Sequence, residues 1–280
     1  MPTCYIVGAG DFTPRGFVPV PGDLVLAADG GYRALYSLGY TPDLLLGDFD
    51  SLGDLPLPPD LPVLRFPARK DDTDTGLALR HGLDRGFRDF ALYGCAGGRV
   101  DHLLANLQSM ARVSRLGATI RLAAPEYDAW ALTGPAPDAS APDASAPDAS
   151  ASHASGPAPH APHTPASHAS APHISASHAS APSTSAPDTS APATPAAPDA
   201  PDALAPAATL TLPDRPGGTL VSVFCHGDRA EGVTLTGLSY SLDGADLTGD
   251  FPLGVSNRRL EGQPATVSVR RGTLLIFQGA

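Results

Sequence analysis

A low-complexity segment takes up about a quarter of the chain and limits what the rest can fold into. Residues 135 to 206 repeat Ala-Pro-Asp-Ala-Ser, then variants of Ala-Ser-His-Ala-Ser-Ala-Pro, with no Lys, Arg or Glu. Their apolar content is nearly all alanine, so the segment buries too little surface to offset the entropy of ordering it. We therefore expect a disordered insertion and a fold built from the residues on either side.

The flanking residues carry a mildly acidic charge. Six aspartates lie in the insertion, so the net charge of −11 for the whole chain becomes −5 outside it. No cluster of Lys and Arg suggests a nucleic-acid partner. The folding part is long enough to bury a substantial core.

Cysteine usage and the N-terminus bear on the compartment. Cys4, Cys95 and Cys225 lie in apolar, strand-like runs without metal-ligand spacing, which favours buried reduced thiols. The N-terminus has neither the basic region nor the apolar run of a signal peptide. No run approaches the roughly 18 apolar residues of a membrane helix. We expect a cytoplasmic protein without a membrane partner.

Short apolar runs alternate with helical patterns through residues 1–125. Six runs are typical of strands: 4–7, 24–28, 44–46, 63–66, 90–93 and 119–123. Three stretches have helical spacing: one that follows Asp29 and ends at Gly39, one at 73–85 and one at 102–116. This alternation predicts an α/β domain with a mostly parallel sheet covered by helices.

From residue 126 to 280 the pattern changes to strands without a helix of useful length. The expected strands are 128–133, 209–212, 220–225, 233–235, 265–269 and 274–277, with Asp243-Gly244 among the turn signals. This half is predicted to form a small antiparallel β-sandwich or barrel. The insertion falls between its first two strands, so we expect it at the tip of a hairpin, where added length costs little.

Aspartates lie beside the expected elements of the first domain at four places. They are Asp29 after the second strand, Asp48 and Asp50 after the third, Asp71, Asp72 and Asp74 before a helix, and Asp101 at the next helix. The carboxyl ends of parallel strands share one edge of a sheet, so these loops bring acids together. Converging carboxylates repel one another unless a cation lies among them, and Mg²⁺ prefers hard oxygen ligands.

Helix capping is the competing explanation for some of these acids. Asp72 and Thr73 are good N-caps, and Asp101 can cap its own helix. Asp48 and Asp50 do not fit that explanation, because they lie two residues apart in an extended stretch and point the same way. We expect this pair to contact a metal or a substrate.

Glycines follow three of the strands, at Gly8-Ala9-Gly10, Gly30-Gly31 and Gly97-Gly98. Backbone N–H groups at helix N-termini bind phosphate oxygens, and Arg99 and Lys70 can add positive charge. A P-loop is excluded, because the only lysine is followed by an aspartate.

A dinucleotide-binding oxidoreductase is the alternative from another class. Gly8-Ala9-Gly10 follows the first strand, and Asp29 ends the second at a suitable distance for a ribose. The third glycine of that fingerprint is missing, because residue 13 is Thr. That interpretation also leaves the acids at 48–50 and 70–74 without a role.

Taken in order, the motifs resemble those of thiamine pyrophosphokinases. The first half carries Ala-Asp-Gly-Gly at 28–31, Pro-Asp at 42–43, Gly-Asp-Phe-Asp-Ser at 47–51, Lys-Asp-Asp-Thr-Asp at 70–74 and Gly-Gly-Arg-Val-Asp-His at 97–102, followed by Asn106. The second half carries Gly-Leu-Ser-Tyr at 237–240 and Gly-Val-Ser-Asn at 254–257. The likeness covers residues 1–134 and 207–280, and the insertion departs from the family's usual length.

The resemblance implies an ATP- and Mg²⁺-binding catalytic domain at 1–125 and a thiamine-binding β-sandwich domain at 126–280. It implies that Asp48, Asp50 and Asp74 hold Mg²⁺ and that, with Asp101, they form the catalytic set. The expected ATP contacts are Asp29, Gly30, Gly31, Lys70, Arg99, Asp101 and His102. The implied reaction moves the terminal diphosphate of ATP to the hydroxyl of thiamine and releases AMP.

The resemblance also implies a homodimer with thiamine bound where the two subunits meet. Tyr240 is a suitable platform for a cationic heterocycle, and Ser256 and Asn257 are expected to contact thiamine. Two alternatives stay open beside the oxidoreductase. One is a pyrophosphokinase for another hydroxymethyl heterocycle, such as a pterin. The other is a nucleotide sensor without catalysis, against which the full set of acids argues.

Overall fold

The computed structural model describes residues 1–49, 52, 55–66, 72–135 and 207–280. The predicted insertion, residues 135–206, lies outside the described residues except for its first residue, Pro135. Asp50, Lys70 and Asp71 also lie outside them. The predictions made for these positions therefore stay predictions.

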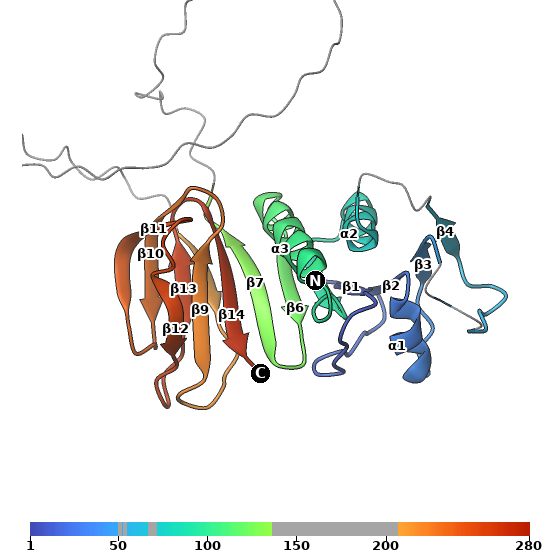
Figure 1. Ribbon diagram of the computed structural model, residues 1–280, viewed down its shortest axis with the longest axis horizontal. Helices are drawn as coiled ribbons and strands as arrows, with labels where there is room; N and C mark the ends of the chain where they lie inside the picture. The colour runs from blue at the N-terminus through green and yellow to red at the C-terminus, as the bar shows by residue number, and fades with distance from the viewer. Residues whose placement is uncertain (50–51, 53–54, 67–71, 136–206) are drawn as a thin grey trace, which may run out of the picture. The chain divides into compact units, whose positions relative to one another are not determined.

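A ten-stranded sheet runs through both halves of the chain, in the order β12-β9-β14-β7-β6-β5-β1-β2-β3-β4 (Figure 1). Its parallel strands are β1 (Cys4–Val7), β2 (Leu24–Ala28), β3 (Leu44–Gly47), β4 (Val63–Arg65), β5 (Asp89–Tyr93) and β6 (Thr119–Ala123). All positions of β1, β2 and β3 are buried, which is why these strands are continuous apolar runs. The mostly parallel sheet predicted for the first half is confirmed.

Helices cover both faces of the parallel strands. On one face, Leu79 of α2 (Asp74–Asp84) and Met110 of α3 (Val100–Arg115) share a core with Ile6. On the other face, α1 (Gly31–Ser37) contributes Tyr32 and Leu35 to a second core. All three predicted helices are present. Among the described residues, no helix is long and apolar enough to span a membrane.

The other strands form the predicted sandwich. The antiparallel strands of the large sheet are β7 (Tyr127–Thr133), β9 (Leu220–Cys225), β12 (Gly254–Arg258) and β14 (Thr273–Gly279). The second sheet, in the order β11-β10-β13-β8, consists of β8 (Ala208–Thr211), β10 (Arg229–Thr236), β11 (Leu242–Thr248) and β13 (Thr266–Val269). Trp130 and Ile276 of the large sheet share one core with Val233 and Val267 of the small sheet.

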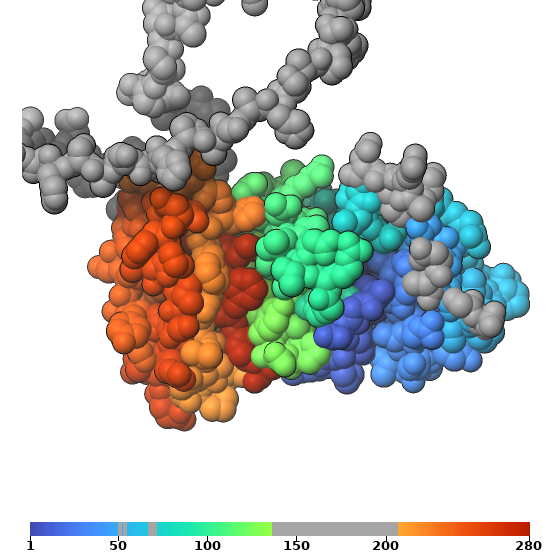
Figure 2. Space-filling model, viewed as in Figure 1, coloured from blue at the N-terminus to red at the C-terminus, as the bar shows by residue number. Residues whose placement is uncertain are grey.

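The large sheet is continuous across residue 125, because β6 pairs with β7 and β7 pairs with β14. Figure 2 shows β14 in red, with orange side chains of the sandwich on one side and green side chains of α3 on the other. The two halves therefore share strands of a single sheet. The domain boundary at 125/126 stays a prediction.

The prediction that the insertion interrupts a hairpin is wrong. β7 pairs with β6 and β14 in the large sheet, whereas β8 pairs with β13 in the small one. The insertion therefore connects two sheets of the sandwich. Strand periodicity shows that a segment is extended but not which strand it pairs with, so the sequence did not distinguish these arrangements.

The predicted turn at Asp243-Gly244 is also wrong, because both residues lie inside β11. Gly244 has a φ of +61°, and the pairing of β10 with β11 shifts register at two places. A glycine with positive φ is typical of an irregular strand as well as of a turn. β11 and β12 were not predicted, because both are short of large apolar residues.

Candidate functional site

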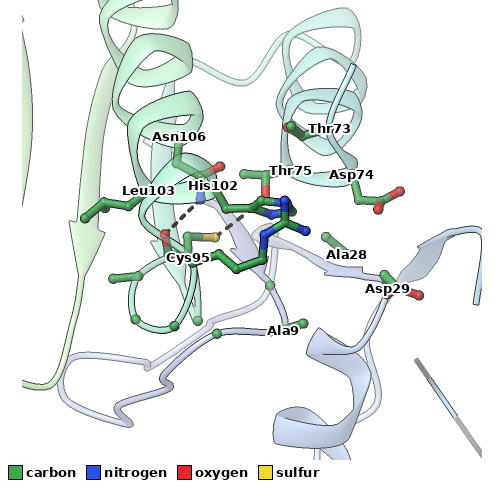
Figure 3. A pocket seen from close by; sticks show the side chains of 17 residues that line it. Ala9, Ala28, Asp29, Thr73, Asp74, Thr75, Cys95, His102, Leu103 and Asn106 are labelled. Carbon is green, nitrogen blue, oxygen red and sulfur yellow. Dashed lines mark hydrogen bonds between the residues drawn. The ribbon is translucent and has the colours of Figure 1, made fainter. Parts of the chain in front are cut away.

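A pocket of about 400 Å³ lies at the carboxyl ends of β1, β2 and β5, beside the N-termini of α2 and α3 (Figure 3). Its lining residues all come from the first half of the chain: Gly8, Ala9, Gly10, Ala28, Asp29, Thr73, Asp74, Thr75, Gly94, Cys95, Ala96, Gly97, Gly98, Arg99, His102, Leu103 and Asn106. This is the sheet edge at which the sequence predicted a site.

Two glycine-containing loops interlock to form one wall of the pocket. The backbone N–H of Gly8 donates to the carbonyl of Tyr93 (2.8 Å), and that of Gly10 donates to the carbonyl of Gly94 (2.7 Å). A Cβ added to Gly10 would lie 2.3 Å from the carbonyl oxygen of Ala96. Glycine is therefore needed for the loops to approach each other this closely.

Asp29 is held against the loop that follows β3. Its φ is +46°, which is uncommon for a residue with a side chain. Its carboxylate accepts a hydrogen bond from the backbone N–H of Phe49 (3.2 Å). A Cβ on Gly47 would lie 3.0 Å from that of Asp29. Asp48 lies between Gly47 and Phe49, the two residues that contact Asp29, but it is not itself a lining residue.

Asp74 enters the pocket from the first turn of α2. Thr73 caps this helix, because its Oγ1 accepts a hydrogen bond from the backbone N–H of Gly76 (3.0 Å). The predicted cap at Thr73 is confirmed. Asp72 instead pairs with Arg80 (2.7 Å). The capping role falls to Thr73, and the carboxylate of Asp74 is directed toward the pocket (Figure 3).

Arg99 and Asp101 form an ion pair at the start of α3. The Arg99 Nε lies 3.1 Å from Asp101 Oδ1, and a second contact joins Nη2 to Oδ2. The hydrogen bond from Arg99 lowers the pKa of Asp101 to about 2, so this carboxylate is ionised at neutral pH. Asp101 does not cap α3, whose N-cap residue Arg99 makes no side-chain capping bond. An uncapped helix N-terminus suits a phosphate group.

The structure brings together four of the predicted site residues: the expected ATP contacts Asp29, Arg99 and His102 and the expected metal ligand Asp74 all line the pocket. Asp101 and Asp48 are not lining residues. Gly30 and Gly31 do not line it either. A Cβ on Gly31 would lie 1.8 Å from the carbonyl oxygen of Val7, so this glycine is required for α1 to pack against β1.

The predicted metal ligands are only partly described. Among the described residues, no three His, Cys, Asp or Glu side chains lie close enough together to hold a metal ion. One predicted ligand, Asp50, and the predicted ATP contact Lys70 lie outside those residues.

Several lining residues were not selected as site residues from the sequence. Asn106 donates from Nδ2 to the carbonyl of Cys95 (2.8 Å), and Thr75 Oγ1 lies 3.9 Å from Cys95 Sγ (Figure 3). Burial raises the pKa of the Cys95 thiol to about 11, so it stays protonated at neutral pH. Asn106 matched a family motif, whereas Thr75 and Cys95 reach the pocket only through tertiary packing.

The predicted thiamine contacts lie together on the sandwich, outside the pocket. Tyr240 is 76% exposed. The buried side chain of Asn257 accepts a hydrogen bond from the backbone N–H of Tyr240 (2.9 Å) and donates one to its carbonyl (2.6 Å). Ser256 has a φ of +59°. Asn257 therefore holds the backbone of the exposed tyrosine in place.

Two family models match the chain. "Thiamin pyrophosphokinase, catalytic domain" matches residues 21–122, and "Thiamin pyrophosphokinase, vitamin B1 binding domain" matches residues 208–274. A curated relative, the thiamine pyrophosphokinase of Bacillus subtilis (strain 168), is 32% identical over 132 residues. That alignment covers 44% of this chain and 60% of the relative, so it spans less than two thirds of the relative's length.

Solved structures share the fold. The crystal structure of thiamine pyrophosphokinase from Bacillus subtilis has a TM-score of 0.65 at 19% identity and covers 99% of both chains. The crystal structure of thiamin pyrophosphokinase from Geobacillus thermodenitrificans has a TM-score of 0.63 at 18% identity, covering 99% of this chain and 97% of the other. The yeast structure has a TM-score of 0.55 at 11% identity, covering 100% and 86%.

The two matched models fall on the two halves of the fold, on either side of the insertion, and together span more than half of the chain. The family suggested by the sequence motifs is confirmed: the chain belongs to the thiamin pyrophosphokinase family.

Proposed function

We propose that the protein transfers the terminal diphosphate of ATP to the primary hydroxyl of thiamine, giving thiamine diphosphate and AMP. The observation that carries this proposal is the glycine-walled pocket with Asp29 and Asp74 on one side and Arg99 on another, in the half that matches the catalytic model. The vitamin B1 binding model on the other half supports thiamine as the acceptor.

The ATP phosphates bind against the interlocked loops and the uncapped N-terminus of α3. Backbone N–H groups there supply hydrogen-bond donors without adding side-chain bulk. Arg99 adds charge, and it exchanges part of its pairing with Asp101 for the phosphate oxygens. Alignment and charge neutralisation are the main requirements of phosphoryl transfer, so a rigid backbone cradle suits the reaction.

Mg²⁺ is the cation that the acidic side of the pocket fits. Asp29 and Asp74 offer carboxylate oxygens, and Asp48 follows the residue that packs against Asp29. The lining thiol of Cys95 is a soft ligand, whereas Mg²⁺ prefers hard oxygen ligands. We infer that Asp48, Asp50 and Asp74 hold the ion, which neutralises charge on the migrating diphosphate when bound. The thiamine hydroxyl proton passes to a pocket carboxylate or to His102.

Thiamine binds at the exposed ring of Tyr240, whose backbone is held by Asn257. An aromatic face attracts a cationic heterocycle. The pocket is lined by none of residues 207–280, so the acceptor has to be presented to it from elsewhere. We infer that a homodimer does this. Edge strand β12 supports the inference, since Val255 is exposed on it, and Phe251 and Leu253 are exposed just before it.

The choice of acceptor is tested by offering two hydroxymethyl heterocycles. With ATP and Mg²⁺ present, thiamine should be converted to its diphosphate, and 6-hydroxymethylpterin should not react. Turnover of the pterin alone would contradict the thiamine assignment while leaving a pyrophosphokinase in place. Failure with both acceptors, together with no binding of ATP, would refute the function.

A further inference from the structure

Asp128 is a buried carboxylate that neither the proposed chemistry nor the family motifs use. It lies in β7, the strand at which the large sheet passes from the α/β half to the sandwich (Figure 1). Its side chain is 1% exposed. Its cross-strand neighbours are Ala123 of β6 and Gln278 of β14.

Three arginines from separate parts of the chain converge on this carboxylate, and together with Asp128 they form what we call the Asp128 cluster. Arg15 Nη1 lies 2.8 Å from Oδ2, Arg121 Nη2 lies 2.8 Å from Oδ1, and Arg215 Nη2 lies 3.3 Å from Oδ2. Their side chains are only 24–30% exposed. A partly desolvated carboxylate that accepts several charge-assisted hydrogen bonds fixes the positions of its donors more strongly than a surface pair does.

Arg15 links Asp128 to the segment that leads out of the proposed nucleotide pocket, and we call this link the Arg15 arm of the cluster. Arg15 lies in the segment 11–17, which continues directly from the pocket-lining turn Gly8-Ala9-Gly10. Its Nη2 also donates to the carbonyl of Ala124 (2.7 Å), and its own carbonyl accepts a hydrogen bond from the Tyr93 hydroxyl (3.4 Å). Phe12 and Phe17 pack their rings against Tyr93 and hold the inner side of this segment. Arg15 fixes its outer side.

Arg215 links Asp128 to the connection between β8 and β9, and this link is the Arg215 arm of the cluster. The neighbouring carbonyl of Pro213 accepts hydrogen bonds from Arg259 Nη1 (3.0 Å) and Gln278 Nε2 (3.1 Å). Both of these donor side chains are almost fully buried. The connection is therefore anchored in the sandwich core, and Arg215 joins it to Asp128.

We propose that Asp128 is a positioning residue for the nucleotide pocket: it anchors segment 11–17 through Arg15 and ties that segment to the sandwich through Arg215. The nucleotide part of this inference rests on the proposed function. Removing the carboxylate itself leaves three guanidinium groups uncompensated and threatens folding. The arms are therefore tested one at a time, with Arg15→Met and Arg215→Met.

The matched control is Arg229→Met. Arg229 pairs with Glu231 and Asp246 on the small sheet and contacts none of the residues of the Asp128 cluster. The first measurement is amide hydrogen exchange of the ligand-free proteins. Exchange over residues 11–17 should be faster in both arm variants and unchanged in the control. Unchanged exchange in Arg215→Met overturns the proposal, whatever the protein does with ATP.

The second measurement is binding of α,β-methylene-ATP, followed by steady-state kinetics. Both arm variants should raise the dissociation constant of the analogue and the KM for ATP, by roughly 2- to 30-fold. The KM for thiamine and kcat should stay at wild-type values. A loss of thermal stability with wild-type nucleotide affinity would show a purely structural role and overturn the proposal. If the wild type does not bind the analogue, the proposed function fails, and hydrogen exchange still decides the role of Asp128.

Discussion

Asp29, Phe49 and Ser256 are the non-glycine residues with positive φ in the part of the chain that the structure describes. Each lies in one of the motifs that the sequence singled out. A side chain in this region of φ costs free energy, and such residues persist where the surroundings fix them, often at functional sites. The motifs were visible in the sequence, but the strain was not, because backbone conformation at a non-glycine residue leaves no compositional signal.

Asp48→Asn and Asp74→Asn should each lower kcat by roughly 100-fold or more while the circular dichroism spectrum stays that of the wild type. The reason is that each change removes a charge from the acidic side of the pocket without changing shape. Asp84→Asn, at the exposed end of α2, is the control and should be neutral. Wild-type turnover in both site variants would contradict the proposed metal ligands.

Tyr240→Ala should raise the KM for thiamine and leave the KM for ATP unchanged. The expected loss is about 0.5 to 2 kcal/mol of binding free energy, because an aromatic face over a cation contributes that much. Tyr36→Ala removes another exposed tyrosine, on α1, and should change neither constant. Equal rises in both constants for Tyr240→Ala would argue against a thiamine-side role.

At the scale of elements, the regular parts of the fold were predictable and their partners were not. The bounds of β6 and β9 match the expected strands, because apolar, β-branched runs bordered by turn residues mark strands well. The pairing of β7 and β8 was mistaken, since register and partner depend on the whole sheet. Asp29 could be predicted at the pocket because it follows a strand, and Asp74 because it opens a helix. The contacts of Cys95 with Thr75 and Asn106 depend instead on how the helices pack.

The interlocked glycine loops give a sharp prediction at this scale. Gly10→Ala should lower the melting temperature and raise the KM for ATP, because its Cβ meets backbone oxygens of the facing loop. Overpacking of this kind costs about 1–3 kcal/mol. Gly22→Ala is the control: Gly22 has a φ of +102° but open space around it, so the variant should lose stability without losing ATP affinity. An unchanged KM for ATP in Gly10→Ala would show that the loops do not shape the pocket.

At the scale of the molecule, one sheet joins the half with the glycine-walled pocket to the half with Tyr240. Side chains also join the two halves on the α3 side of the sheet. There, Arg115 Nε donates to Thr273 Oγ1 (3.1 Å) and Thr133 Oγ1 donates to Ser114 Oγ (2.9 Å). With the Asp128 cluster on the sheet as well, polar contacts tie the halves at two places. We therefore expect the halves to unfold together.

Replacing residues 136–206 with an eight-residue Gly-Ser linker should leave activity and melting temperature nearly unchanged. β7 and β8 each keep their own partners, and the linker has to cross from one sheet to the other, about 10 Å away. A shorter connection costs less closure entropy, by roughly 1–2 kcal/mol. Differential scanning calorimetry and turnover measure the outcome. Loss of turnover in a folded variant would give the insertion a functional role.

The central claim, diphosphate transfer, is tested most directly with ATP labelled by radioactive phosphorus. One sample carries the label at the β position and another at the γ position, and each is incubated with the protein, Mg²⁺ and thiamine. Diphosphate transfer puts both labels into thiamine diphosphate and releases AMP in an equal amount. If only the γ label reaches thiamine, and ADP accumulates, the protein transfers a single phosphoryl group and the account is contradicted.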